Sequence, residues 1–187
     1  MTDKKTLILS SAVKLFVQNG FDRVSTAEIS KTAGVATGTM FYHFKSKEDI
    51  IISSYKAIKK EIISQTYLSD SENITIKEEL KQLWQNIILW SLDNQDKVQY
   101  LLQFKNSPYY CNDLMAEDDT WKGRLEWWKN GIENGVFKQI PLDFLLKTFN
   151  DLLFGTIEYL MHHDKEIKKY IDMSFTICWD SVRENNL

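Results

Sequence analysis

Apolar residues recur at three- and four-residue spacing along most of this chain, which is the pattern of amphipathic helices. Near the N-terminus, Ile8, Ala12 and Phe16 form such a stripe, and Gly20 follows where a helix commonly ends. The same pattern predicts helices over about 4–19, 26–33, 37–43, from 47 onward, 75–93, 97–105, 110–134, 141–162 and 165–184. With two prolines, seven glycines and little strand-like alternation, the chain is predicted to be all-α.

The second and third predicted helices have clear boundaries. Ser25 and Glu28 have the spacing of a capping box, in which each side chain bonds the backbone of the other residue. Gly34 can adopt the positive φ that a sharp turn requires. Two short helices joined by a glycine turn form a helix-turn-helix, whose second helix enters the major groove of DNA.

The residue types of the second of these helices suit that role. Met40 and Phe44 can pack beneath it, which leaves four side chains to project: Thr37, Thr39, Phe41 and Tyr42. Threonine methyl groups suit thymine methyl groups, and Lys47 with the N-terminus of the next helix suits a phosphate. The alternative is an αα-corner in an ordinary core, which exposed aromatic residues beside glycine disfavour.

Charge is distributed unevenly although the net charge is only −3. Residues 1–60 carry 10 Lys or Arg and 5 Asp or Glu, whereas residues 61–187 carry 13 and 21. A basic end on an acidic body indicates that only one end meets a polyanion. The polar segment Ser69–Asn73 is the predicted break between the basic end and the acidic body. By function, we predict a DNA-binding domain over residues 1–47 and a helical effector-binding and dimerisation domain over residues 48–187.

The last two predicted helices are apolar on two sides, which indicates burial on two sides. The core can cover one side, and a second subunit can cover the other through a self-complementary, two-fold patch. Alternatively, both helices are central in a monomer core. The residues predicted to form the homodimer contact are Leu146, Phe154, Ile157, Met161, Ile171, Phe175 and Cys178.

The acidic body is rich in aromatic rings, which are common in the walls of ligand pockets. We expect a small lipophilic or aromatic effector to lie among Trp84, Phe104, Tyr110, Trp121, Trp128 and Phe149. Aromatic faces near carboxylates also suit a lipophilic cation. Taken singly, each of these rings can equally be a core residue.

Other functional classes find little support in the sequence. No apolar run is long enough to span a bilayer, and the N-terminus has no signal-peptide pattern, so we expect a cytoplasmic protein without membrane contact. Cys111 and Cys178 lack metal-ligand spacing, and His162 and His163 point about 100° apart on a helix. The acidic run at 117–119 is expected to be a helix cap rather than a calcium site. With no catalytic motif, we predict no enzyme activity, no cofactor and no metal.

At residues 8–51, ILSSAVKLFVQNGFDRVSTAEISKTAGVATGTMFYHFKSKEDII, the chain resembles the DNA-binding domain of the TetR/AcrR family of bacterial transcriptional regulators. The resemblance implies about nine helices per subunit of a two-fold dimer. It implies an N-terminal three-helix helix-turn-helix domain followed by a helical ligand-binding and dimerisation domain. Such regulators are usually repressors of a palindromic operator in double-stranded DNA, released by a small-molecule effector.

Carried over by position, the resemblance implies phosphate contacts from Ser25, Thr26, Tyr42, His43 and Lys47. It implies base or groove contacts from Thr37, Gly38, Thr39 and Phe41. Ala36 departs from the family's usual capping serine or threonine, so the third helix is expected to be less firmly capped. The alternatives are a ligand-blind or protein-gated regulator, or an all-α enzyme or carrier that contains a helix-turn-helix.

Overall fold

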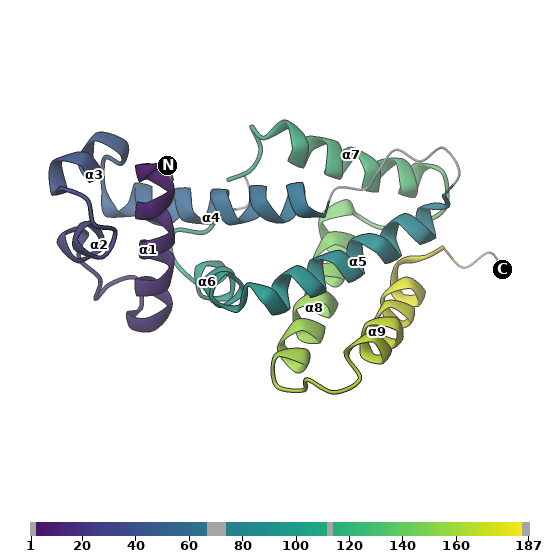
Figure 1. The fold of residues 1–187 in the computed structure, drawn as a ribbon. Coiled ribbons are helices and arrows are strands. Elements are labelled where there is room, and N and C mark those ends of the chain that lie inside the picture. The colour runs from purple at the N-terminus through teal and green to yellow at the C-terminus, as the bar shows by residue number, and fades with distance from the viewer. Residues whose placement is uncertain (1–2, 67–73, 112–113, 185–187) are drawn as a thin grey trace. The chain divides into compact units, whose positions relative to one another are not determined.

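The structure, a computed structural model, describes residues 3–66, 74–111 and 114–184. Within these ranges the chain forms nine helices and no strand, which confirms the all-α prediction (Figure 1). The helices are α1 (Lys4–Asn19), α2 (Thr26–Thr32), α3 (Thr37–His43), α4 (Lys47–Gln65), α5 (Ile76–Asp93), α6 (Gln95–Lys105), α7 (Asp119–Glu133), α8 (Leu142–Met161) and α9 (Ile167–Val182).

The predicted start of α7, near residue 110, is wrong by about nine residues, whereas the other predicted boundaries lie within two residues of those observed. Pro108 disfavours helical backbone at Ser107, whose hydroxyl accepts a hydrogen bond from the Tyr109 backbone N–H at 3.3 Å. Helix α7 starts instead after Asp118, whose carboxylate accepts a hydrogen bond from the Trp121 backbone N–H at 3.1 Å. The expected acidic cap is therefore present. The predicted break at 69–73 lies outside the described residues.

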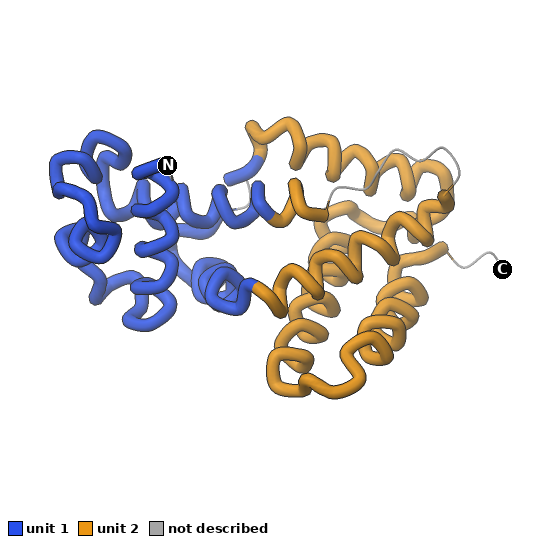
Figure 2. The backbone as a smooth tube through the Cα atoms, in the orientation of Figure 1, with its two compact units in different colours: residues 1–61, 94–115 blue, residues 62–93, 116–187 orange. Residues whose placement is uncertain are grey.

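Contacts divide the chain into two compact units (Figure 2). Unit 1 comprises residues 1–61 and 94–115, and unit 2 comprises residues 62–93 and 116–187. Unit 1 therefore contains α1 to α3, most of α4, and α6. These structural units do not coincide with the functional division into 1–47 and 48–187, which stays a prediction.

In unit 1, α1 packs against α2, α3 and α6. Its apolar stripe is buried as expected, with Ile8, Ala12 and Phe16 fully covered. Phe16 meets the ring of Tyr100 from α6 at 6.3 Å between centroids. Burial of this stripe is a main driving force for the folding of unit 1, because helices as short as α2 and α3 are not stable without tertiary packing.

In unit 2, α8 and α9 pack against each other and α5 packs against both. The core is aromatic: the ring of Phe149 lies 5.5 Å from Trp84 and 5.1 Å from Trp128. The Phe137 ring occupies the space where a side chain at residue 131 would lie, so this close approach requires Gly131. Large rings in contact bury much apolar surface, and each pair adds about 0.5–1.5 kcal/mol beyond burial.

The two-sided pattern of α8 and α9 is observed, but the predicted dimer residues need correction. Four of them are buried inside unit 2 of a single chain and are not available to a partner: Ile157, Ile171, Phe175 and Cys178. The other three are half-buried: Leu146, Phe154 and Met161. The exposed apolar side chains of these helices are instead Phe144, Tyr159, Met173 and Ile177. The repeat pattern identified two apolar sides but not which of them faces the core.

Candidate DNA-binding surface and effector region

Helices α2 and α3 are built by local hydrogen bonds and one glycine turn. The Ser25 hydroxyl oxygen accepts a hydrogen bond from the Glu28 backbone N–H at 3.1 Å. After α2 the chain turns at Gly34, whose φ of 65° lies in the left-handed region that glycine adopts without steric cost. Ala36 holds the N-cap position of α3 and its side chain makes no capping hydrogen bond. Both predicted helix starts and the weak cap are thus confirmed.

The inner side of α3 is firmly anchored. Met40 and Phe44 are fully buried, and so is Ser30 on α2. The Ser30 hydroxyl donates to the Ala27 carbonyl oxygen at 3.0 Å and lies 3.4 Å from the Thr37 hydroxyl oxygen. A small side chain at residue 30 lets the two helices meet closely, so their mutual orientation is fixed by both packing and hydrogen bonding.

The outer side of α3 presents large side chains to solvent. Tyr42 is 86% exposed and Phe41 is 48% exposed. The Tyr42 ring rests edge-on against the half-buried His43, with 5.2 Å between ring centroids. Of the residues expected to contact bases, Thr37 and Gly38 are exposed and Thr39 is half-buried. A short helix that buries one side and exposes aromatic rings on the other has the form of a surface that meets a partner.

Lys47, expected to contact a phosphate, also has a structural role. Its ammonium donates to the carbonyl oxygens of Phe21 at 3.0 Å and Asp22 at 3.3 Å. Both carbonyls lie between α1 and α2, so Lys47 fastens the first turn of α4 to that connection. An ammonium has three protons to donate, and one remains for an outside acceptor. Sequence reasoning missed the structural role because the partners are backbone atoms 25 and 26 residues away.

The other expected phosphate contacts lie at the start of α2. Ser25 is exposed, and because its oxygen accepts from Glu28, its hydroxyl proton can still be donated outward. Thr26 beside it is half-buried. The amides at a helix N-terminus favour anions, which adds to the hydroxyl contact.

Between residues 20 and 47, three exposed cations were not identified as candidate contacts from the sequence: Arg23, Lys31 and Lys45. Each can add to the electrostatic attraction for a phosphate backbone. The charge balance of residues 1–60 was the signal that could have identified them.

Helix α6 is hydrogen-bonded to α4 and α1 within unit 1. The buried Tyr100 hydroxyl donates to the Ile51 carbonyl oxygen at 2.7 Å, and the Gln103 amide donates to the Val17 carbonyl oxygen at 3.1 Å. Burial raises the pKa of the Tyr100 hydroxyl above its usual range, so it stays protonated and remains a donor. A displacement of α6 would therefore break bonds to two helices of the unit that contains α3.

The six rings expected around an effector fall into separate groups. Phe104 and Tyr110 belong to unit 1, where their centroids are 6.2 Å apart and Phe104 stacks on Tyr55 at 4.4 Å. The others belong to unit 2: Trp84, Trp121, Trp128 and Phe149. In unit 2, Trp84, Trp128 and Phe149 are buried in ring contacts, whereas Trp121 is half-buried. Their role in ligand binding stays a prediction.

Two negative findings concern the described residues alone. Among them, no group of three or more metal-ligating side chains comes together. In the same part of the chain, no helix has the length and apolar character needed to cross a membrane.

Residues 8–53 match the family model for bacterial regulatory proteins of the tetR family. The fatty acid metabolism regulator protein of Bacillus subtilis (strain 168) is 38% identical to this chain over 156 residues. That match covers 81% of this chain and 78% of the relative.

Solved structures have the same fold. A candidate tetR family transcription regulator from Shewanella sp. PV-4 has a TM-score of 0.89 and 26% identity, over 98% of this chain and 100% of that one. The transcriptional regulator FadR from Bacillus subtilis, solved in complex with stearoyl-CoA, has a TM-score of 0.73 and 20% identity, over 95% and 99% of the two chains. The relatives match both the DNA-binding helices and the rest of the fold, and the chain belongs to the TetR family of DNA-binding transcriptional regulators.

Proposed function

We propose that this regulator is a homodimeric repressor that leaves a palindromic operator when a long-chain acyl-CoA binds its C-terminal helices. Residues 1–47 would bind DNA, and residues 48–187 would bind the effector and the second subunit. The identity of 38% with a fatty acid metabolism regulator supports the link to fatty acids, and the FadR structure solved with stearoyl-CoA suggests the acyl-CoA class of effector. The genes it controls would then serve fatty-acid metabolism.

For DNA binding, we assign two kinds of contact. Thr37, Gly38, Thr39 and Phe41 would meet base edges, because they belong to a short, anchored helix on which Thr39 is half-buried and the other three are exposed. Phosphates would be met by Ser25, Thr26, Tyr42, His43 and Lys47, which would fix the position of the helix on the duplex. A two-fold dimer presents two copies of α3 to half-sites about one helical turn apart.

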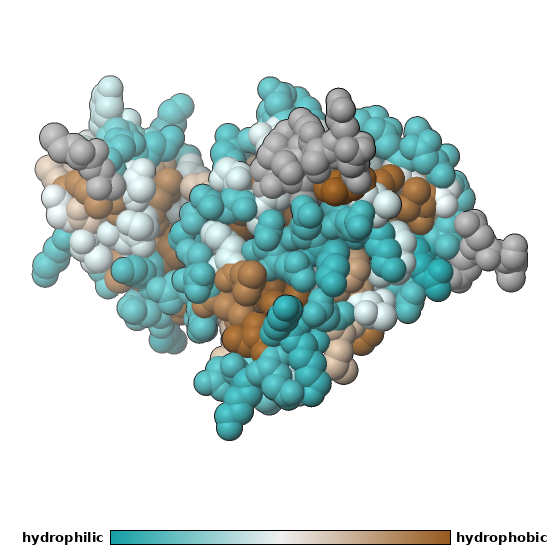
Figure 3. All heavy atoms as spheres, turned by 45° about the vertical axis from the view of Figure 1, so that its right-hand side comes forward, coloured by the Kyte–Doolittle hydropathy of each residue, from teal (hydrophilic) through white to brown (hydrophobic). Residues whose placement is uncertain are grey.

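For dimerisation, the support is the exposed apolar side of α8 and α9. Phe144, Tyr159, Met173 and Ile177 are between 42% and 61% exposed in the single chain. Figure 3 shows hydrophobic side chains reaching the surface of the molecule among the hydrophilic ones. A pair of helices meeting its own copy about a two-fold axis would cover these side chains without any further element.

For the effector, an acyl chain needs an apolar lining, and the rings of unit 2 offer one. Because the Phe149 ring contacts the rings of both Trp84 and Trp128, the acyl chain would have to separate them or lie beside them. A ligand that binds better to a rearranged body shifts the population toward that state. If the rearranged state binds DNA poorly, the ligand releases the operator.

The test is fluorescence anisotropy of an operator duplex selected from random sequence, with stearoyl-CoA, stearate and free CoA added in turn. We expect stearoyl-CoA to weaken operator binding about tenfold or more, which is the usual size of an allosteric coupling. An operator affinity that stays constant with stearoyl-CoA would contradict the proposed effector and favour a ligand-blind or protein-gated regulator.

The dimer has its own test with a matched control. Ile177→Glu places a charge on the exposed side of α9, whereas Leu89→Glu places one on α5 of the same unit at similar exposure, 49% against 59%. We expect Ile177→Glu to be a monomer by light scattering and Leu89→Glu to remain a dimer. A dimer in both variants would exclude the proposed surface.

A further inference from the structure

A groove of about 490 Å³ lies in unit 2 between the first half of α5 and residues 172–183 of α9 and its C-terminal end. This volume is within the usual range for small-molecule sites. The groove is neither purely apolar nor purely charged, since rings and side chains of both charges line it. It is distinct from the cluster of Trp84, Trp128 and Phe149, to which the effector chain was assigned.

An aromatic ring in the groove is covered by a flexible cation. The Lys77 ammonium lies 5.5 Å from the centre of the Trp179 ring. Within the described part of the chain, Lys77 has no ion-pair partner. A cation–π contact at an exposed site is weak, about 0.5–1 kcal/mol, so a planar ligand can replace Lys77 on this ring at small cost.

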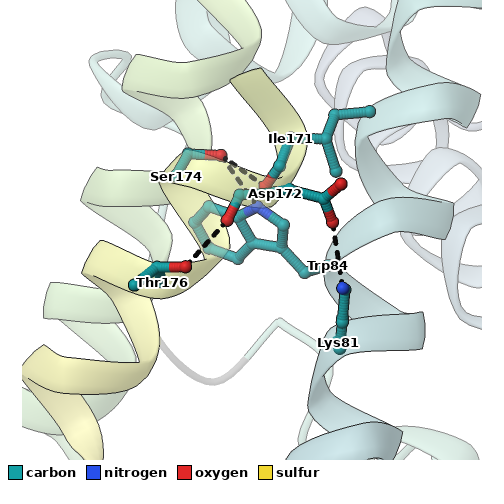
Figure 4. A network of polar contacts seen from close by, with 6 residues as sticks. All are labelled: Lys81, Trp84, Ile171, Asp172, Ser174 and Thr176. Carbon is teal, nitrogen blue, oxygen red and sulfur yellow. Dashed lines mark hydrogen bonds and ion pairs between the residues drawn. The ribbon is translucent and has the colours of Figure 1, made fainter. Parts of the chain in front are cut away.

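Two more cations border the groove, each in an exposed ion pair. The Lys81 ammonium is 2.9 Å from an Asp172 carboxylate oxygen (Figure 4), and the Arg183 guanidinium is 2.8 Å from Asp180. All four side chains are at least two-fifths exposed, so each pair contributes little and can exchange one partner. Counted with Lys77, the lining carries three cations and two carboxylates.

The groove is supported from behind by fixed contacts. The Trp84 indole N–H donates to the Ser174 hydroxyl oxygen at 3.1 Å, which joins α5 to α9 (Figure 4). Phe175, which also lines the groove, is almost fully buried. The cations are thus carried on exposed side chains, whereas the wall that carries Trp179 is joined to α5 by the Trp84–Ser174 hydrogen bond. This arrangement favours a ligand with one flat and one anionic part.

We propose that this groove binds a phosphorylated nucleoside, with its base against Trp179 and its phosphates between Lys77 and Lys81. Arg183 is a third cation within the lining, and the carboxylates of Asp172 and Asp180 can accept hydrogen bonds from amino and ribose hydroxyl groups. Lys77 and Lys81 are four residues apart on one helix and so face the same side. The nucleoside has two sources: a free adenine nucleotide, or the nucleotide end of coenzyme A. Only the second rests on the proposed function.

Calorimetry on the full chain tests the site with adenosine 3′,5′-bisphosphate, ADP, free CoA and inorganic phosphate as probes. The test variant is Lys77→Gln combined with Lys81→Gln. The control is Lys129→Gln, which removes an exposed lysine of α7 that belongs to the same unit and does not line the groove. We expect the bisphosphate to bind more tightly than phosphate, and the double variant to weaken it about tenfold or more. Lys129→Gln should leave binding unchanged.

The probes also separate the two sources. Binding of ADP as tight as that of CoA indicates a free nucleotide, whereas tighter binding of CoA and the 3′,5′-bisphosphate indicates the CoA end. Failure of all three nucleotides to bind, or equal binding by the double variant and the wild type, overturns the groove site whatever stearoyl-CoA does to the operator. If instead stearoyl-CoA fails to release DNA while the nucleotides bind, the proposed function is overturned and the groove site stands.

Discussion

Helix α3 in unit 1 and the ring cluster in unit 2 both contain large aromatic side chains, which are exposed on α3 and buried in unit 2. On α3, Phe41 and Tyr42 are large and exposed, while the side chains beneath them are buried. In unit 2, Trp84, Trp128 and Phe149 are large and buried, and the Phe149 ring contacts both tryptophan rings. Aromatic residues in a sequence therefore do not distinguish a core from a binding surface. The two cases differ in the packing around the rings. Helix α3 packs on one side only and leaves its other side exposed, whereas the rings of unit 2 are covered by other side chains.

The largest expected effect separates two cysteines. Cys111 in unit 1 is exposed, and Cys178 in unit 2 is buried. Burial raises the pKa of the Cys178 thiol to about 12, so about one thiol in ten thousand is ionised at pH 8. We expect a thiol reagent to modify one cysteine per chain quickly and the second only on unfolding, with rates differing by more than about a thousandfold. Rapid loss of both thiols from folded protein would show that the core of unit 2 opens readily.

The next largest effect is expected from removing a buried ring of unit 2. Trp84→Ala removes a fully buried ring that contacts Phe149 and donates a hydrogen bond to Ser174. We expect the free energy of unfolding to fall by about 3–5 kcal/mol, measured by urea denaturation. Tyr42→Ala is the control, because its ring is exposed and its loss should change stability by less than about 0.5 kcal/mol. Similar losses in both variants would remove the contrast between core and surface rings.

Much of the fold was predictable from the sequence because its signals are local. Helix α2 starts at a capping serine and is followed by Gly34 in a left-handed turn, and both signals lie within ten residues. The start of α7 was missed because two local signals competed. The apolar spacing continued the helix toward residue 110, whereas the Asp118 cap sets its start at Asp119.

The candidate DNA-binding site could be predicted from the sequence only where its residues belong to a single helix. Thr37 to Tyr42 occupy a single short helix, so their exposed side follows from the buried positions of Met40 and Phe44. The role of Lys47 and the pairing of Tyr100 with Ile51 depend on long-range contacts to backbone carbonyls. Such partners carry no side-chain signature, because every residue has the same carbonyl group. The inward side of α9 could not be chosen from its apolar spacing alone, because it depends on where α5 and α8 pack against it.

A smaller effect is expected from removing an exposed ring of α3. Tyr42→Ala removes a ring with no role in the core, so we expect operator affinity to fall about tenfold while stability is retained. Tyr42→Phe keeps the ring and removes the hydroxyl. If the hydroxyl contacts a phosphate, Tyr42→Phe should lose most of the affinity that Tyr42→Ala loses, as measured by anisotropy on the same duplex. Full affinity in both variants would remove Tyr42 from the interface.

The smallest effect lies at the start of α3, where the exposed surface begins. Ala36 gives no capping hydrogen bond, whereas Ser25 caps α2 through the Glu28 N–H. Ala36→Ser supplies an oxygen that can accept from the Thr39 N–H, so we expect a gain of about 0.5–1 kcal/mol in the free energy of unfolding. Ser25→Ala, the matched change on α2, should cost about 1 kcal/mol. If the amides at the start of α3 also meet a phosphate, the new serine competes for them, and operator affinity falls while stability rises. A gain in both quantities would mean that DNA does not use these amides, and that α3 binds through its side chains alone.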